Sequence, residues 1–202
     1  MKNKISSGFT FTNLLFGLAM GCLWGVMVAD YCLKLANQFS WPLMLLVALA
    51  ALLCLALAFV LQIVLHELGH LLFGLLSGYG FVTFRFGPRL LAQCGLFCRC
   101  VMCPPEPDED GCFPLSLYSL GGIFLNLLSG LLFLLLYFIS GGMLLLTLFS
   151  LSAGILGLGF GLMFALPVKY SDGYNALWLN DDDAAIHEHW LRLRELASQE
   201  EA

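Results

Sequence analysis

The chain has 202 residues, of which 60% are hydrophobic and 11% are charged, and its net charge is -5. A soluble globular domain is usually about a quarter charged and about half apolar. A chain of this length cannot bury so much apolar surface in one aqueous core, so the excess must face lipid. Because the sequence contains no basic stripe, we expect no nucleic-acid partner.

Four apolar segments are long enough to cross a bilayer. We expect these spans at about residues 10–35, 41–77, 114–139 and 143–166. The first is expected to be retained, because its basic start is followed by no convincing signal-peptide cleavage site. As one helix the second would be roughly 55 Å long, against a hydrocarbon core of about 30 Å. It must therefore tilt, kink or project from the membrane at one end.

The stretch 79–113 differs from the spans in composition. Its segment Phe81–Phe86 alternates in a β-prone pattern that Gly87 and Pro88 then break. We expect a short membrane-associated β-hairpin or strand, followed by a loop rich in cysteine and proline. The cysteines of this loop are Cys94, Cys98, Cys100, Cys103 and Cys112. Their spacing lacks the paired C-x-x-C of common zinc modules, so buried thiols are favoured over disulfides or a second metal site.

The tail, residues 181–202, is expected to form an amphipathic helix on the membrane surface. Three aspartates, Asp181–Asp183, suit the positive end of a helix dipole. Apolar residues then recur at helical spacing and form one stripe. The stripe consists of Ile186, Trp190, Leu193 and Ala197. The sequence thus predicts an all-α integral membrane protein with a membrane domain over residues 1–180 and this tail.

The basic residues predict the orientation of the chain. Lys2 and Lys4 place the N-terminus in the cytoplasm by the positive-inside rule. With four spans, residues 79–113 and the tail are on the same side of the membrane as the N-terminus. Both of these segments carry basic residues of their own. The connecting loops near 36–40 and 140–142 carry no basic residue. We expect a multi-pass protein of a bacterial cell membrane with both termini cytoplasmic.

The second span contains the motif His66-Glu67-Leu68-Gly69-His70. Residues i and i+4 share a helix face, so both imidazoles can reach one zinc ion. Glu67 is then placed to act as a general base toward water. A chance match is the alternative, but two histidines and a glutamate in an apolar run cost several kcal/mol unless they find partners. We therefore predict one catalytic Zn²⁺.

A catalytic zinc site needs a third protein ligand, and Asp172 is the best candidate. It follows the fourth span, which returns to the membrane face where the second span ends. Gly173 is expected to allow turn geometry beside the metal. An ordinary Asp-Gly turn is the alternative. The run Asp181–Asp183 is a rival ligand source, although it is better explained as helix-capping charge.

Three motifs together resemble the site-2 protease family of intramembrane zinc metalloproteases, over roughly residues 41–180. They are the HExxH sequence, Gly121-Gly122-Ile-Phe-Leu-Asn126, and Pro167-Val-Lys-Tyr-Ser-Asp172-Gly173. The resemblance implies that His66, His70 and Asp172 hold zinc and that Glu67 activates water. It also implies a β-hairpin after the HExxH helix, which residues 81–91 can supply. Its strand Phe84, Arg85, Phe86 would pair with a substrate held in extended form.

The chain departs from the family pattern at two positions. Phe164 stands where the family usually has an asparagine, and Tyr174 replaces the usual second glycine after Asp-Gly. A polar group that stabilises the substrate or the transition state must then come from elsewhere. Asn126 and Asn175 are the candidates. The stretch 79–113 is also too short for the regulatory PDZ domain of longer members.

The implied function is hydrolysis of peptide bonds within transmembrane segments. Substrates would be single-span membrane proteins or membrane-inserted peptides in the lipid bilayer, as in regulated intramembrane proteolysis or signal- and pheromone-peptide processing. The alternative is an inactive homologue that binds membrane segments as a regulator, which Phe164 favours and the intact Glu67 opposes. A metal transporter would need further ligands along a path through the spans. A serine protease would need a histidine beside Ser129 or Ser152.

Overall fold

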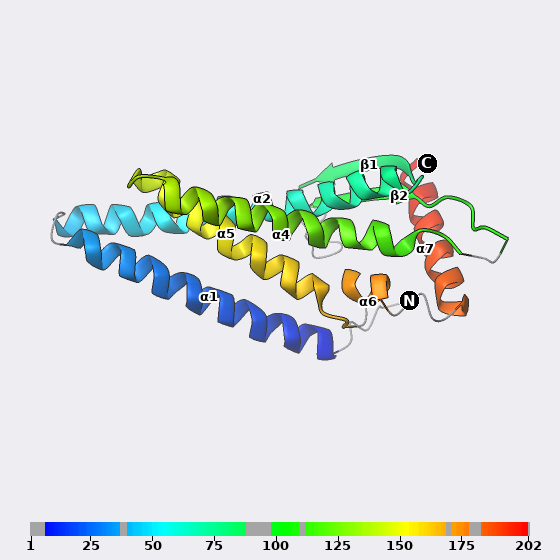
Figure 1. Ribbon diagram of the computed structural model, residues 1–202, viewed down its shortest axis with the longest axis horizontal. Helices are drawn as coiled ribbons and strands as arrows, with labels where there is room; N and C mark the ends of the chain where they lie inside the picture. The colour runs from blue at the N-terminus through cyan, green and yellow to red at the C-terminus, as the bar shows by residue number, and fades with distance from the viewer. Residues whose placement is uncertain are drawn as a thin grey trace. The chain divides into compact units, whose positions relative to one another are not determined.

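The structure is a computed structural model that describes residues 7–36, 40–87, 98–109, 112–168, 171–177 and 183–201. Most of these residues are helical (Figure 1). The helices are α1 (Ser7–Ala36), α2 (Trp41–Leu76), α4 (Leu115–Ile139), α5 (Leu144–Ala165), α6 (Asp172–Leu177) and α7 (Asp183–Glu201). The strands are β1 (Gly80–Phe86) and β2 (Cys98–Cys103).

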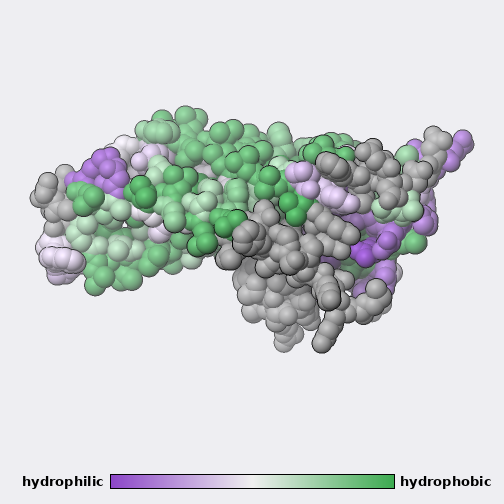
Figure 2. All heavy atoms as spheres, turned by 90° about the horizontal axis from the view of Figure 1, so that it is seen from below, coloured by the Kyte–Doolittle hydropathy of each residue, from purple (hydrophilic) through white to green (hydrophobic). Residues whose placement is uncertain are grey.

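Four helices are long and apolar enough to cross a membrane, namely α1, α2, α4 and α5. The predicted fold class is therefore confirmed, and each predicted span agrees with its helix to within a few residues. The long second span is one continuous helix, with Pro42 in its first turn, where the missing N–H costs nothing. Many large apolar side chains on these helices are exposed, such as Leu18, Leu53 and Leu132. Figure 2 shows hydrophobic residues over much of the helical surface, as lipid-facing helices require.

The chain divides into two compact units, and the division differs from the expected boundary at residue 180. Unit 1 is Met1–Gln62 with Leu127–Met163, and unit 2 is Ile63–Asn126 with Phe164–Ala202. The tail helix therefore belongs to the same unit as the HExxH motif. Sequence composition could not reveal this, because the boundary depends on which segments pack together.

Unit 1 packs α1, α2 and α5 around an apolar core that contains hydrogen-bonded polar groups. Core residues include Val28, Val47, Ala51, Leu148, Leu151 and Ile155. The fully buried amide of Gln62 donates to the carbonyl oxygen of Ala153 at 2.9 Å and accepts from Ser129 Oγ at 3.0 Å. Trp24 Nε1 donates to Ser152 Oγ at 2.8 Å. Polar groups within apolar spans need such partners, so both serine hydroxyls have a structural role here.

In unit 2, α2 ends at a left-handed glycine. Gly78 has a φ of 81°, and the N–H of Tyr79 donates to the carbonyl of Gly74 at 2.9 Å. This arrangement is a common helix C-terminus, where glycine has no Cβ penalty. It turns the chain from the HExxH helix directly into β1.

The expected hairpin is confirmed in part and its second strand corrects the sequence interpretation. β1 pairs antiparallel with β2, with Phe84 opposite Cys100 and Phe86 opposite Cys98. Residues 98–103, predicted to be loop, are therefore a strand. Alternate residues Cys98, Cys100 and Met102 are buried, because thiols behave as small apolar side chains on one face of a strand. Residues 88–91 of the expected hairpin lie outside the described part of the chain.

The predicted tail helix is present as α7, but its apolar stripe is buried in the protein. Ile186 and Trp190 pack with Tyr79, Met102 and Phe113 in the core of unit 2. Leu193 packs against this core and Ala197 is also buried. The sequence predicts that this stripe faces the membrane surface, whereas in the structure it packs against β2 and other residues of unit 2. Figure 1 shows α7 beside the two strands. Asp181 and Asp182 lie outside the described residues.

Candidate metal centre

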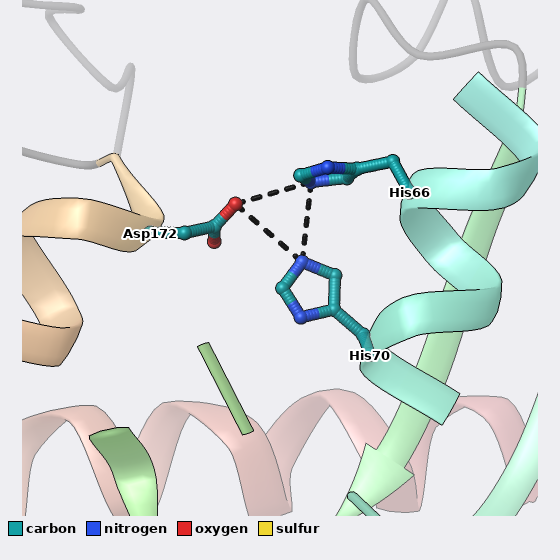
Figure 3. A group of neighbouring side chains, drawn as sticks. All are labelled: His66, His70 and Asp172. Carbon is teal, nitrogen blue, oxygen red and sulfur yellow. Dashed lines mark hydrogen bonds and ion pairs between the residues drawn. The ribbon is translucent and has the colours of Figure 1, made fainter. Parts of the chain in front are cut away.

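Three side chains from two helices converge in unit 2 (Figure 3). His66 and His70 lie one turn apart on α2, and their Nε2 atoms are 3.2 Å apart. Asp172, the first residue of α6, places its Oδ2 3.1 Å from His66 Nε2 and 3.5 Å from His70 Nε2. The ligand atoms of this group lie within 4.8 Å of one another. The group could hold a metal ion, with the three residues that the sequence predicted.

The connection before α6 positions Asp172. Ser171 is buried, and its Oγ accepts from the N–H of Tyr174 at 3.1 Å, as an N-capping serine does. The same hydroxyl donates to the carbonyl of Leu166 at 2.6 Å, which ties the start of α6 to the end of α5. Asp172 therefore projects from a fixed helix start.

Gly173 is required for a different reason from the one expected. Its φ is not among the positive values that mark turn glycines. A Cβ at this position would collide with the backbone of Phe164 and Ala165. The glycine therefore allows α6 to approach the last turn of α5, and this approach brings Asp172 to the histidines.

Burial and charge act in opposite directions on Asp172. Burial by itself raises the pKa of this carboxyl group. Electrostatic interaction with His70 and hydrogen bonds with both imidazoles outweigh burial and hold the pKa of Asp172 well below its ordinary value. The carboxylate is therefore ionised, which is the form that binds a metal ion.

The outer nitrogen of each imidazole also has a partner. His70 Nδ1 donates to the carbonyl oxygen of Tyr118 at 3.0 Å. The amide nitrogen of Asn126 lies 3.1 Å from His66 Nδ1, and Asn126 is fully buried. Asn126 was predicted to stabilise the substrate or the transition state. Its amide lies against the imidazole of His66, and its predicted role toward the substrate remains a prediction.

Two glycines of α4 let its backbone pass directly beside the histidines. Gly121 meets Gly69 of α2 so closely that a Cβ on either would collide with the other's backbone. A Cβ on Gly122 would lie 2.6 Å from His66 Cε1 and 2.8 Å from His70 Nε2. These contacts explain why the Gly-Gly pair accompanies the HExxH motif, which sequence spacing alone does not reveal.

Glu67 is held by the sheet. Its Oε2 accepts a hydrogen bond of 2.6 Å from the backbone N–H of Cys100 in β2, and the residue as a whole is only 8% exposed. No sequence pattern could have indicated this contact, because the donor is a backbone group. Burial, and secondarily the charge of Glu67, raises the pKa of the Cys98 and Cys100 thiols to about 12. Both thiols are therefore protonated at neutral pH.

Phe164 packs on His66 with ring centroids 4.3 Å apart. The half-buried Asn175 donates its backbone N–H to Ser171. Within the part of the chain described, no side-chain hydrogen bond joins Asn175 to the metal-binding group. The predicted role of Asn175 as a stabiliser remains a prediction.

The predicted substrate-pairing residues lie on β1. Phe84 packs against the core of unit 2, whereas Phe86 is exposed and Arg85 pairs with Glu200 of α7. Among the described residues the sheet consists of β1 and β2. The edge of β1 that faces away from β2 therefore pairs with no other described strand.

Fold and site together define a helical chain with four candidate membrane spans and a buried His-His-Asp group able to hold a metal ion. Comparisons of the chain with protein-family models, with curated proteins and with solved structures found no match.

Proposed function

We propose that the protein is an intramembrane zinc metalloprotease. The observation that carries the proposal is the convergence of Asp172 with the two HExxH histidines. These histidines lie on α2, which is largely apolar. Ionisable residues within a membrane span are energetically costly, and they usually mark a functional site. The class of protease is the one implied by the resemblance to the site-2 protease family.

The donor set fits zinc. Two imidazole nitrogens and one carboxylate oxygen leave a fourth position open, as in catalytic zinc sites. Ligands about 2.0–2.2 Å from a tetrahedral ion lie roughly 3.3–3.6 Å from one another, and the separations within this group are 3.1–3.5 Å. The hydrogen bond from His70 Nδ1 to Tyr118 leaves Nε2 free to bind. A flip of the Asn126 amide would place its oxygen opposite His66 Nδ1 and give the same result.

Glu67 is proposed as the general base. When bound, zinc would polarise the scissile carbonyl and lower the pKa of a water molecule. The N–H of Cys100 holds Oε2 of Glu67, which leaves Oε1 to take the proton of the attacking water. The carboxyl group then passes that proton to the leaving amine. His66, His70 and Asp172 hold the ion, and Asn126 with Tyr118 orients the imidazoles.

The proposed substrates are single-span membrane proteins or membrane-inserted peptides. A peptide bond within a helix is enclosed by its own hydrogen bonds, so the substrate must unwind before it is cut. The outer edge of β1, around Phe84–Phe86, can pair with the unwound segment. In the proposed orientation the site opens toward the cytoplasm, on the side of both termini.

The second candidate function is binding of membrane segments without cleavage. It is favoured by Phe164, whose ring packs on His66 in the place of the family's asparagine. Under this alternative the metal ion would bind, but no peptide bond would be hydrolysed.

Cleavage of a panel of single-span reporter proteins in liposomes tests the proposal. We expect fragments from at least one reporter, loss of cleavage when a chelator removes zinc, and recovery when zinc is restored. If the zinc-loaded protein co-purifies with reporters but cuts none, the binding function replaces the protease. A reporter cut equally well without zinc would contradict the metal mechanism.

Replacing Gly122 by alanine is expected to weaken zinc binding. The added methyl group would push against both imidazoles, because its position is 2.6 Å from His66 Cε1. We expect at least about a tenfold loss of zinc affinity, measured by competition with a fluorescent chelator. Gly25→Ala on α1 is the matched control, since a Cβ there meets nothing within 4 Å. Equal zinc affinity in both variants would show that the imidazoles are not in the described positions.

Replacing Asn126 by alanine removes the partner of His66 Nδ1. Loss of such an outer hydrogen bond typically costs about 10–100-fold in metal affinity or activity. We expect a loss in this range, with the HExxH residues untouched. Asn126→Asp, which retains an acceptor oxygen, should preserve more of the affinity than alanine does. If alanine and aspartate behave alike and like the wild type, Asn126 does not orient His66.

A further inference from the structure

A cavity of about 170 Å³ lies directly beside the proposed catalytic residues in unit 2. Glu67 and His70 line one part of it. The other walls come from β2, from Tyr118 of α4 and from α7. The proposed hydrolysis uses Glu67 and His70 but gives no role to the cavity or to α7.

We propose that this cavity is the subsite for a large apolar side chain of the substrate, adjacent to the scissile bond. The proposal rests on the proposed protease function and extends it to substrate choice. It also makes α7, the C-terminal helix, a determinant of specificity, because α7 contributes Leu193 and Leu196 to the cavity wall.

The size of the cavity fits a branched aliphatic or aromatic side chain. An apolar cavity of about 150 Å³ is large enough to bind benzene, and this one is somewhat larger. Small side chains such as alanine would leave most of it empty. Substrates drawn from transmembrane segments are rich in leucine and phenylalanine, which supply side chains of the required size.

The walls of the cavity are mixed, with polar atoms near Glu67, His70 and Arg99 and apolar side chains on α7. The two leucines of α7 line the cavity opposite β2, which contributes Val101 and Met102, and we propose that an apolar side chain lies against these residues. The carboxylate of Glu67 borders the cavity and would repel an acidic side chain. Arg99 also lines the cavity, so an acidic side chain is the rival occupant that the test must exclude.

The wall supplied by α7 is firmly held. Trp190 is buried and its Nε1 donates to the carbonyl of Pro105 at 2.9 Å. Ile186 of the same helix lies in the core of unit 2. A specificity pocket requires rigid walls, so that it does not adapt to a substrate side chain of the wrong size. A helix anchored at these positions meets that requirement.

Binding of peptide hydroxamates to the zinc-loaded, detergent-solubilised protein tests the subsite without depending on catalysis. The compounds would differ only in the side chain next to the zinc-binding group, which is methyl, isobutyl, benzyl or carboxyethyl. Calorimetry should show the isobutyl and benzyl compounds binding at least about tenfold more tightly than the methyl compound. The carboxyethyl compound should bind no better than methyl.

Leu196→Trp should fill the cavity and remove this advantage, leaving the methyl compound and the zinc content unchanged. Leu191→Trp is the matched control, because Leu191 lies on α7 but is 49% exposed. It should retain the full preference. In reporter cleavage, Leu196→Trp should shift the preferred residue beside the cut from large to small.

Three results would overturn the proposal. One is an unchanged preference in folded, zinc-loaded Leu196→Trp. Another is tightest binding of the carboxyethyl compound, abolished by Arg99→Gln. The third is equal affinity for all side chains in the wild type, which would remove the subsite while leaving the zinc site intact. A protein that binds neither zinc nor any hydroxamate would instead show that the proposed function itself is wrong.

Discussion

Glu67→Gln is expected to abolish peptide hydrolysis while zinc stays bound. General acid–base catalysis contributes about 10²–10⁴-fold to rate, and we expect reporter cleavage to fall by about 10³-fold or more. Glutamine keeps an oxygen that can accept the hydrogen bond from the Cys100 N–H, so the contact between α2 and β2 should survive. It cannot take a proton from water. Cleavage rates in liposomes, measured beside bound zinc, check this result.

The matched control is Glu188→Gln, which removes an exposed carboxylate of α7 that pairs with Arg192. We expect this variant to cut at close to the wild-type rate, because exposed ion pairs contribute little to stability. Cleavage by Glu67→Gln at the wild-type rate would contradict the role of Glu67 as general base. Loss of zinc in the same variant would instead assign Glu67 to the metal site.

Asp172→Asn is expected to remove most of the zinc affinity. The carboxylate oxygen lies 3.1 Å from His66 Nε2 and is held ionised, and an amide oxygen is a much weaker ligand without charge. Loss of an outer hydrogen bond to a ligand already costs about 10–100-fold in affinity, so loss of a ligand should exceed about 100-fold. Titration of the stripped protein with zinc, in competition with a chelator of known affinity, checks the result.

Asp30→Asn provides the control for this substitution. Asp30 is an exposed carboxylate on α1 whose described partner is Lys34, and the change should leave zinc affinity unaltered. Full zinc affinity in Asp172→Asn would mean that Asp172 is not a ligand. The third ligand would then have to be sought elsewhere, with Asp181–Asp183 as the rival predicted from the sequence.

The spans and the three metal-binding residues could be predicted from the sequence because they depend on local pattern and topology. A segment exposed to lipid must form its backbone hydrogen bonds within itself, so a long apolar segment is expected to be a helix. His66 and His70 share a face by helix periodicity alone. Asp172 could be predicted because the third and fourth spans together would return the chain to the membrane face where the second span ends.

The surroundings of the site could not be predicted, because they depend on which helices cross and where. The contact of Gly122 with both imidazoles, and that of Asn126 with His66, exist only once α4 lies beside α2. The hydrogen bond from Cys100 to Glu67 is donated by a backbone N–H, which any residue except proline could supply, so the amino-acid sequence does not indicate it.

The sequence predicts the wrong environment for one element and the wrong secondary structure for another. The stripe beginning with Ile186 and Trp190 has the same periodicity whether it faces lipid or protein, and the structure buries it against unit 2. Cys98 and Cys100 are buried, as the sequence predicts, but they lie in a strand where a loop is expected. Periodicity identifies a face but does not identify what covers it.

The most direct test of the zinc site is metal analysis of the purified protein combined with X-ray absorption spectroscopy at the zinc edge. We predict one zinc ion per chain, with nitrogen and oxygen ligands at about 2.0–2.2 Å and none at the longer distance of sulfur. Asp172→Asn should lose this signal and Glu67→Gln should keep it. Absence of zinc, or a ligand shell of sulfur at about 2.3 Å, would contradict the His-His-Asp site and the hydrolytic mechanism proposed for it.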